Sequence, residues 1–426
     1  MLLRARILLP VTAPPIEDGA VLVSGVRIAV VGRWRDVRAL TQEPAVDLGE
    51  VVLLPGLVNA HCHLDYTHLA GHLAPPRRFT DWLQGVLVLK AEWSYSEFAA
   101  SWLAGAAQLL HRGCTCVLDF EAVPELLPEV WQASPLRVIS ALEMTGVRSA
   151  RAPHAILDEA LACAQTLGDA RHRIALAPHA PYSTPPQLLE LVATAGATHR
   201  LLTAIHVAES ADEFAMFREA SGPMYDWLRP QRDMADCGKG TPVAHVARSG
   251  LLGPTCLVVH ANHLEPDDYR TLARSGATVV HCPRSHDYFG RDPFPYAEFR
   301  RAGVPVCLGT DSLLSVRKMG RGIPQLDPFA EMALFAARHP DIPPREVLSL
   351  MTTVPARAMG LGGELGDLVP GMLADMIAAP FAGGVSEAPA AIIQAGGAVA
   401  ASLIGGAWAV RSDRVPPGLR EDFPSS

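Results

Sequence analysis

The 426-residue chain lacks an uninterrupted apolar run long enough to cross a bilayer, because glycine, proline or charge breaks its richest apolar runs within a strand's length. A short apolar run near the amino terminus is interrupted by Pro10 before it could serve as a signal sequence. An excess of positive charge is also lacking, since 36 Lys and Arg stand against 44 Asp and Glu, for a net charge of -8. These absences predict a cytoplasmic protein with small-molecule partners and no nucleic-acid or membrane partner.

Cysteine is scarce as well. Eight cysteines are scattered without regular spacing, which favours reduced thiols over a disulfide framework. Cys114 and Cys116 alternate within an apolar run, so on a strand they would share a face. A metal or redox pair is one interpretation of that spacing, but packing is the more frequent role, because a free cysteine behaves as a small hydrophobic residue.

The pattern of expected strands and helices changes along the chain. Hydrophobic residues make up 49% and charged residues 19%, which is typical of a globular protein with a large core. Residues 1–52 contain short β-like runs, residues 53–361 alternate apolar strands with helical stretches, and residues 362–415 return to short β-like pieces. We therefore predict an α/β protein in which a (β/α)8 barrel (53–361) carries a small discontinuous β-sandwich domain built from both termini (1–52 and 362–415). Residues 416–426 are rich in proline, serine and charge and predict a flexible tail.

Polar residues follow several of the expected barrel strands. A barrel carries its chemistry at the carboxyl ends of its strands, so the residues that end each strand are informative. A lone histidine at a strand end is usually a hydrogen-bonded structural residue, but five such ends converging on one mouth predict a site. The strands are expected at 51–60, 115–120, 137–143, 173–178, 202–207, 255–259, 277–280 and 304–309, and the polar residues at their ends are His61, His63, His179, His206, His260 and Asp311.

The first strand ends with two histidines separated by one residue. Because side chains alternate along a strand, His61 and His63 should point the same way, and Cys62 should point the opposite way into packing. With His206 and Asp311 they form a nitrogen and oxygen set suited to one divalent ion such as zinc or iron. The set is too rich in nitrogen for calcium or magnesium.

The motifs "PGLVNAHCHLD", "HVAES", "VVHANHL" and "LGTDSL", in this order, resemble the amidohydrolase superfamily. The resemblance is to its single-metal deaminase and chlorohydrolase branch, which includes nucleoside-type deaminases such as those of S-adenosylhomocysteine, methylthioadenosine and aminodeoxyfutalosine. It extends over nearly the whole chain, because "PGMLADMIAAP" near the end also resembles the family. The resemblance implies one metal ion held by His61, His63, His206 and Asp311, a proton-shuttling Glu209, and a His260 that polarises water or substrate.

These roles are chemically coherent. A metal-bound water has a pKa of roughly 7, so hydroxide is available at neutral pH to attack an amino-bearing ring carbon. Asp311 can take the proton, Glu209 can protonate the adjacent ring nitrogen, and His260 can stabilise the developing charge while ammonia leaves. The alternative role for Glu209 is a carboxylate that stabilises a helix start.

The fourth strand has no lysine at its end. Related two-metal enzymes use a modified lysine there, so its absence, with His179 in its place, implies one metal ion and deamination. By the same resemblance His179 faces the substrate, and Trp82 in "RRFTDWLQG" is a stacking platform for a heterocycle. The alternatives are a structural role for His179 at the barrel mouth and packing within a lid for Trp82.

Two stretches depart from the pattern of the nucleoside deaminases. Thr80 and Asp81 stand where methylthioadenosine and S-adenosylhomocysteine deaminases have a glutamate that holds the ribose hydroxyls. His286 stands where many relatives have asparagine, a variant that resembles members acting on larger adenosine derivatives. His286 is therefore a candidate substrate contact. Arg148 and Arg284 are candidate contacts for an anionic group, or solvated surface residues.

The sequence predicts a metal-dependent aminohydrolase that replaces an exocyclic amino group on a purine-like or nucleoside-derived heterocycle with oxygen. One alternative is a chlorohydrolase of the same fold that acts on triazine-like rings. Another is a catalytically silent binding or assembly protein, which should have lost metal ligands, whereas this chain keeps them all. Because members of this group often form dimers, a homodimer is a further expectation.

Overall fold

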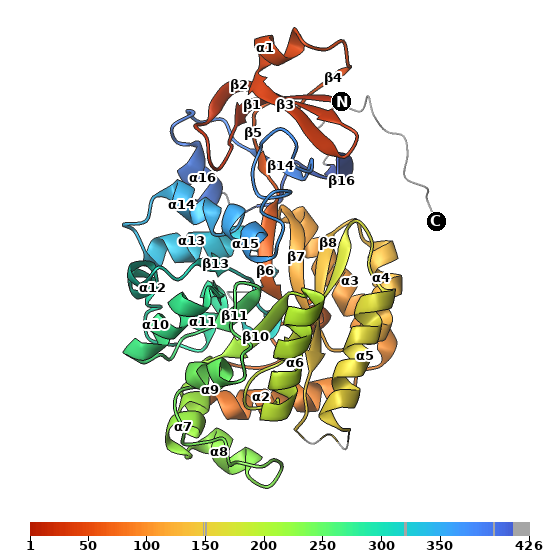
Figure 1. Cartoon of the computed structure of the whole chain (residues 1–426). Coiled ribbons are helices and arrows are strands. Elements are labelled where there is room, and N and C mark those ends of the chain that lie inside the picture. The colour runs from red at the N-terminus through yellow and green to blue at the C-terminus, as the bar shows by residue number, and fades with distance from the viewer. Residues whose placement is uncertain (148, 150, 319–321, 395–396, 412–426) are drawn as a thin grey trace.

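The computed structural model describes residues 1–147, 149, 151–318, 322–394 and 397–411. Arg148 and the predicted tail lie outside these described residues. Two sheets organise the chain, a parallel barrel and a mixed sheet made from both ends of the sequence (Figure 1). The barrel strands are β6 (Leu57–Cys62), β7 (Cys114–Glu121), β8 (Arg137–Met144), β9 (His172–Pro178), β10 (Thr203–Val207), β11 (Cys256–His260), β12 (Thr278–His281) and β13 (Val306–Leu308).

The barrel strands pair in sequence order from β6 to β13, and neighbouring strands are parallel. The end of the first strand and the segment after the last strand complete the ring, since Cys62 and Asp311 form a parallel bridge. The amides of Thr310 and Asp311 both donate to the His61 carbonyl, at 3.0 and 3.1 Å. The prediction of a (β/α)8 barrel is confirmed.

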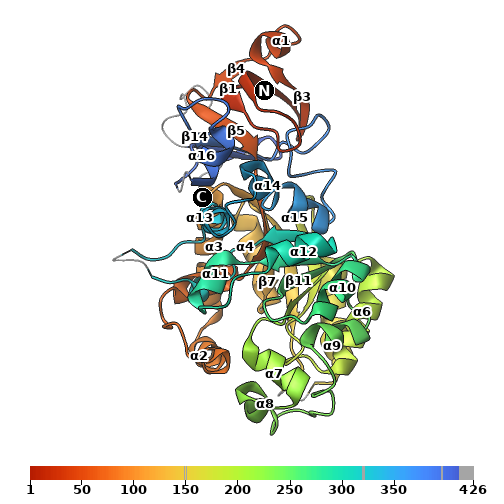
Figure 2. The same ribbon diagram turned by 90° about the vertical axis from the view of Figure 1, so that its left-hand side faces the viewer.

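Helices surround the barrel and alternate with its strands (Figure 2). Pro at the first turn, which tolerates a missing amide, starts many of them, and side-chain caps such as that of Ser94 at α3 start others. The helices are α1 (Trp34–Arg38), α2 (Phe79–Ala91), α3 (Tyr95–His111), α4 (Leu127–Ala133), α5 (Pro153–Thr166), α6 (Pro186–His199), α7 (Ala211–Glu219), α8 (Pro223–Leu228), α9 (Pro242–Arg248), α10 (Pro266–Ser275), α11 (Pro283–Tyr288), α12 (Tyr296–Ala302), α13 (Pro328–Arg338), α14 (Pro344–Ser349), α15 (Thr353–Ala358) and α16 (Ala388–Gln394), with 3-10 turns η1 (Leu64–Leu69), η2 (Pro124–Leu126) and η3 (Leu313–Ser315).

Both chain ends build the second sheet, whose strands run in the order β16-β15-β14-β5-β1-β2-β3, with β4 beside β1. Figure 1 shows the red amino-terminal strands and the blue carboxyl-terminal strands meeting at one end of the barrel. Alternate residues of this sheet, among them Leu3, Leu53 and Met376, are buried in a core of their own. The strands are β1 (Leu2–Leu8), β2 (Ile16–Ser24), β3 (Arg27–Arg33), β4 (Ala45–Asp47), β5 (Val51–Pro55), β14 (Met376–Pro380), β15 (Ala401–Ile404) and β16 (Ala407–Arg411).

The first expected barrel strand, 51–60, is in fact two strands. β5 belongs to the terminal sheet, where it pairs with β1 and β14, and β6 begins the barrel. Gly56 separates them because the backbone passes close to a neighbour there. A Cβ at Gly56 would lie 2.0 Å from Thr115 Oγ1. The boundary between these two strands lies within one continuous apolar run, so the hydrophobic pattern does not show it and only the packing around Gly56 does.

The carboxyl ends of the barrel strands lie away from the terminal sheet and are covered by α2, α7 and α8 (Figure 1). Phe79, Tyr182, Phe217, Met224 and Leu228 pack together in this cover. All eight cysteines are free, and seven of them are buried, so the packing interpretation of the cysteines holds. None of the helices in the described part of the chain is long and apolar enough to cross a membrane.

Candidate active site

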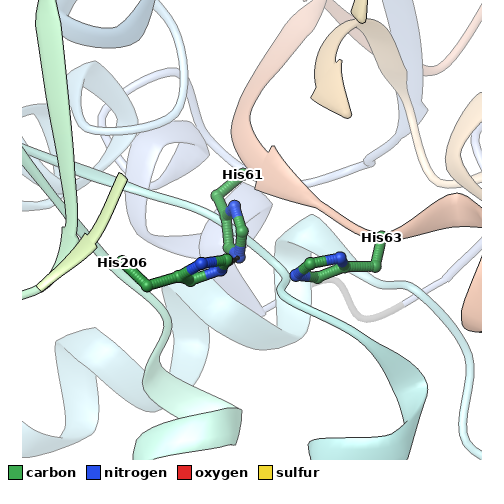
Figure 3. A group of neighbouring side chains, drawn as sticks. All are labelled: His61, His63 and His206. Atoms are coloured by element: carbon green, nitrogen blue, oxygen red, sulfur yellow. Dashed lines mark hydrogen bonds between the residues drawn. The ribbon is translucent and has the colours of Figure 1, made fainter. Parts of the chain in front are cut away.

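Three imidazoles and one carboxylate converge at the barrel mouth. His61 Nε2 lies 3.3 Å from His206 Nε2 and 3.4 Å from Asp311 Oδ1, and His63 Nε2 lies 3.8 Å from the same Asp311 oxygen. Figure 3 shows the rings of His61, His63 and His206 directed toward one another. All four side chains are buried. The structure therefore brings together the four residues that the sequence predicted as metal ligands.

The inward direction of His61 depends on an irregularity in β6. Val58 and Ala60 already face the barrel interior, whereas Cys62 packs in the cluster outside it. Strict alternation from Ala60 would send His61 outward. The pairing register between β6 and β7 shifts between Asn59 and Cys62, and this shift changes the phase of alternation so that His61 also points inward.

Backbone contacts fix the orientation of the imidazoles. His206 Nδ1 lies 2.8 Å from the His179 carbonyl and so carries the proton that it donates. The lone pair of His206 is therefore on Nε2, aimed at His61 Nε2. His61 is fully buried, and its Nδ1 has no hydrogen-bond partner among the described residues. The Asp311 carboxylate accepts from the Ser312 amide at 2.8 Å and from the Ser315 hydroxyl at 3.1 Å.

The donor set fits a divalent metal ion. Two sets of ligand atoms, one from His61, His63 and His206 and the other from His61, His260 and Asp311, each lie within 4.8 Å of one another. Lone pairs that face each other across 3.3 Å are repulsive unless a proton or a cation lies between them. Nitrogen and oxygen ligands in this number suit zinc or iron.

Burial sets the charge state of the centre. It lowers the pKa of His63 and of His206 well below the usual value, with neighbouring imidazoles adding to the effect, so both are neutral near pH 7. Burial also lowers the pKa of His260, to about 3. For Asp311 burial by itself raises the pKa, but the hydrogen bond with His61 and the nearby histidines hold it well below its usual value. Neutral imidazoles beside a carboxylate are the protonation states that a metal site requires.

Left-handed backbone marks the ends of three strands at this mouth. Ala208, His260, Ala261 and Asp311 have φ of 52°, 76°, 49° and 54°. Such values are costly for residues other than glycine and tend to gather where a site is formed. Here they turn the chain at the point where β10, β11 and β13 end, which aims His260 and Asp311 into the mouth.

Glu209 is held at the same mouth by a neighbouring carboxylate. The buried Glu213 accepts the amides of Ala208 at 2.9 Å and Glu209 at 2.7 Å, while Ser210 caps α7 by accepting the Glu213 amide. The Glu209 side chain is thereby freed from capping the helix and lies with Oε1 3.7 Å from His260 Nε2. Burial raises the pKa of Glu209 well above its usual value, although nearby Arg291 opposes the shift. A buried carboxyl that keeps a proton near neutral pH can serve as a proton carrier.

Arg291 was missed by the sequence analysis. Its Nη1 donates to the Glu209 carbonyl, and its Nη2 lies 3.3 Å from Glu209 Oε1. The guanidinium is buried and lies over the ring of Phe289, 4.7 Å from the ring centroid. The only signal was an arginine after an aromatic pair in "HDYFGRDP", and that pattern alone does not indicate a partner.

A small cavity at the histidine centre receives two of the predicted substrate contacts. His179 and Trp82 both line it. His179 is oriented by a 2.7 Å hydrogen bond between its Nδ1 and Ser183 Oγ. Trp82 packs edge-on against Phe289 and at a tilt against Phe79, with centroid separations of 5.1 and 5.6 Å.

The other predicted contacts are placed differently. His286 lines a separate cavity of about 270 Å³. Its two ring nitrogens face Asn262 Oδ1 at 3.0 Å and the Asp292 carbonyl at 2.7 Å. Arg284 bonds the Gln325 carbonyl with its side chain and Glu331 with its amide. Arg148 is outside the described residues, so its role stays a prediction.

The chain is similar to several known proteins. A 5-methylthioadenosine/S-adenosylhomocysteine deaminase from Syntrophobacter fumaroxidans is 30% identical over 375 residues, which cover 86% of this chain and 80% of the relative. An aminodeoxyfutalosine deaminase from Deinococcus radiodurans is 30% identical over 315 residues, covering 70% of this chain and 73% of the relative. The solved structure of a zinc-bound adenosine deaminase from Xanthomonas campestris superposes with a TM-score of 0.82 at 24% identity, covering 98% of this chain and 94% of that one.

The sequence profile of the amidohydrolase family matches residues 52–408, which include the whole barrel and all the residues that converge at its mouth. The chain therefore belongs to the amidohydrolase family.

Proposed function

We propose that the protein is a metal-dependent hydrolytic deaminase of a purine-like or nucleoside-derived heterocycle. The observation that carries the proposal is the buried set of three imidazoles and one carboxylate, with the buried Glu209 carboxyl beside it. Two relatives named as deaminases of adenosine derivatives support the choice of reaction.

His61, His63, His206 and Asp311 would hold one divalent ion, with zinc favoured because a solved structure of the same fold carries it. When bound, the ion lowers the pKa of a water molecule and so supplies a nucleophile at neutral pH. The alternative ion for this donor set is iron.

The chain's own residues move the protons. Glu209 donates its proton to the ring nitrogen beside the carbon under attack, and Arg291 keeps that carboxyl in place. The Asp311 carboxylate accepts one proton from the attacking water and returns it to the departing amine, which leaves as ammonia. Glu209 then recovers its proton from the hydroxyl left on the ring carbon, which becomes the carbonyl of the product. His260, neutral near pH 7 because burial lowers its pKa to about 3, donates a hydrogen bond to the attacking oxygen.

The remaining residues orient the ring and exclude water. Trp82 and Phe79 supply aromatic surface on one side of the cavity. His179 faces the ring from the end of β9, held by Ser183. The cover formed by α2, α7 and α8 closes this space from solvent, which strengthens the electrostatic interactions inside it.

The test is ammonia release by the purified, zinc-loaded protein. The panel consists of adenine, adenosine, methylthioadenosine, S-adenosylhomocysteine, aminodeoxyfutalosine, guanine, cytosine and a chlorinated alkylaminotriazine. Ammonia from an adenosine derivative is the expected result. Release of chloride or alkylamine from the triazine, with no ammonia from the purines, would overturn the proposal in favour of a chlorohydrolase. No turnover and no bound metal would overturn it in favour of a binding protein.

A further inference from the structure

A second cavity, here called the side chamber, adjoins the small cavity at the histidine centre. Its volume is about 160 Å³. Tyr66, Leu83, Val86, His179 and Tyr182 line both spaces. Because these residues form a common wall, a ring seated at the histidine centre can extend a substituent into the side chamber.

The chamber is mostly apolar. Leu83, Val86 and Leu87 come from α2, and Trp227 and Leu228 come from α8, so the two covering helices enclose it. Apolar walls of this kind cover the carbon skeleton of a bound group, while a few polar groups set its orientation.

Two unused hydrogen-bond acceptors stand among these walls. Gln231 donates its Nε2 to the Trp227 carbonyl at 2.6 Å, which leaves its Oε1 buried with no partner. Glu143, near the end of β8, lines the chamber and has no hydrogen bond or ion pair with any described residue. A buried acceptor without a donor, such as Gln231 Oε1, is costly, so the chamber is suited to a ligand that brings donors to it and to the half-buried Glu143 carboxylate.

The charges of the chamber favour neutral donors. Lys90 is the one lysine or arginine among its described lining residues. Its ammonium bonds the Tyr66 hydroxyl at 2.7 Å and lies 3.9 Å from Asp65 Oδ2. The positive charge of Lys90 and the negative charge of Glu143 offset each other across the chamber. Lys90 is already engaged by Tyr66 and Asp65, so it is not free to bind an anionic substituent, and its positive charge disfavours a cationic one.

We propose that Glu143 and Gln231 bind the hydroxyl groups of a sugar-like substituent on the heterocycle. This inference rests on the proposed function and names the part of the substrate that lies beyond the reacting ring. Hydroxyls donate to the Glu143 carboxylate in charge-assisted bonds and to Gln231 Oε1 in a neutral one. Thr80, in the first turn of α2, is not available for this role, because its amide and hydroxyl both donate to Asp212 at 2.9 and 2.7 Å.

The experiment compares adenosine with 2′,3′-dideoxyadenosine, which keeps the reacting ring and lacks the 2′ and 3′ hydroxyls of the sugar. The kcat/KM for ammonia release is measured for both compounds with zinc-loaded wild type and with Glu143→Gln. The expected result is a wild-type preference for adenosine that falls by about 10- to 100-fold in the variant. The kcat/KM for the dideoxy compound should differ by less than about threefold between wild type and Glu143→Gln, because this compound has no 2′ or 3′ hydroxyl for Glu143 to bind.

Two further variants sharpen the test. Gln231→Met removes Oε1 and fills similar space, and should reduce the preference for adenosine by about tenfold, since a neutral hydrogen bond is weaker than a charged one. Glu190→Gln is the matched control, because Glu190 is exposed on α6. Each preference is a ratio within one protein, so a smaller folded fraction cancels.

The outcomes separate the two proposals. Ammonia from neither nucleoside with wild type, and from no other purine, overturns the proposed function itself. Ammonia from both nucleosides, with a preference that is absent in wild type or unchanged in Glu143→Gln, overturns only the hydroxyl site.

Discussion

The two ends of the barrel treat buried charge in opposite ways. At the amino end, Arg137 and Asp375 form a bidentate pair, with Nε to Oδ2 at 3.1 Å and Nη2 to Oδ1 at 3.2 Å. This pair joins β8 to the terminal sheet, and Asp375 also accepts the Gly405 amide. At the carboxyl end, the nitrogens of His61 and His206 face one another across 3.3 Å, so that acceptors lie against acceptors.

The difference separates structural charge from functional charge. A buried ion pair whose donors and acceptors match is complete without a ligand. Removing one partner leaves the other as a buried charge without compensation, which destabilises the fold. A cluster of acceptors that face one another, in contrast, attracts a cation. Substitutions at the carboxyl end should therefore change activity, whereas substitutions at the amino end should change stability.

The largest expected effect is on activity, from His206→Ala. Loss of one imidazole should remove most of the bound metal and lower kcat/KM by about 1,000-fold or more. Metal content by mass spectrometry and ammonia release check it, with His199→Ala, an exposed histidine on α6, as the control. Full turnover in His206→Ala would exclude the metal mechanism.

Glu209→Gln should lower kcat by about 100- to 10,000-fold while metal content stays near that of wild type, because a glutamine cannot carry the proton. Steady-state kinetics and metal analysis check this expectation. Glu219→Gln is the control, because Glu219 is exposed at the end of α7, the helix that follows Glu209. An unchanged rate with normal metal content would remove Glu209 from the proton path.

Asp375→Asn should act on stability instead. Breaking the buried pair should lower the free energy of unfolding by about 3–5 kcal/mol, while kcat per folded enzyme stays within about twofold. Urea unfolding measures the first and active-site titration the second. The control is Asp287→Asn, whose exposed pair with Arg338 should contribute less than about 1 kcal/mol. A loss of kcat in Asp375→Asn with no loss of unfolding free energy would contradict a purely structural role for this pair.

The smallest expected effect is on the pH dependence of stability. Burial raises the pKa of Glu331 from 4.5 to about 8, with Arg284 only partly opposing the shift. The folded state therefore holds a proton that the unfolded state has released, and this contribution is full below about pH 4.5 and lost as the pH rises through about 8. Unfolding free energy should fall between pH 6 and pH 9 in wild type and fall less, by on the order of 1 kcal/mol, in Glu331→Gln. Equal slopes would contradict the assignment.

The barrel and its family were predictable because their signals are local. Each of the eight runs expected as barrel strands contains one, although the run 51–60 also contains β5, and polar residues stand where these runs end. Predictions of the family and of the (β/α)8 barrel are confirmed, and the names of the relatives agree with the prediction of a nucleoside-type deaminase. The roles of the individual site residues stay predictions, although the structure gathers His61, His63, His206 and Asp311 as expected.

Other features depended on contacts between distant segments. Arg291 reaches Glu209 from 82 positions along the chain, so no sequence spacing relates the two. Gln231 and Glu143 meet in one chamber only because α8 folds over the end of β8. His286 follows a familiar motif, yet its ring nitrogens are engaged by Asn262 and Asp292 beside another cavity.

The sequence by itself determined which residues end the strands, because hydrophobic alternation and its interruptions are properties of neighbouring residues. The tertiary structure decided where those residues point. Gly56 divides one apolar run between two sheets because Thr115 leaves no room for a side chain. The register shift after Asn59 turns His61 inward, since pairing with β7, and not the order of residues, sets the phase of the strand.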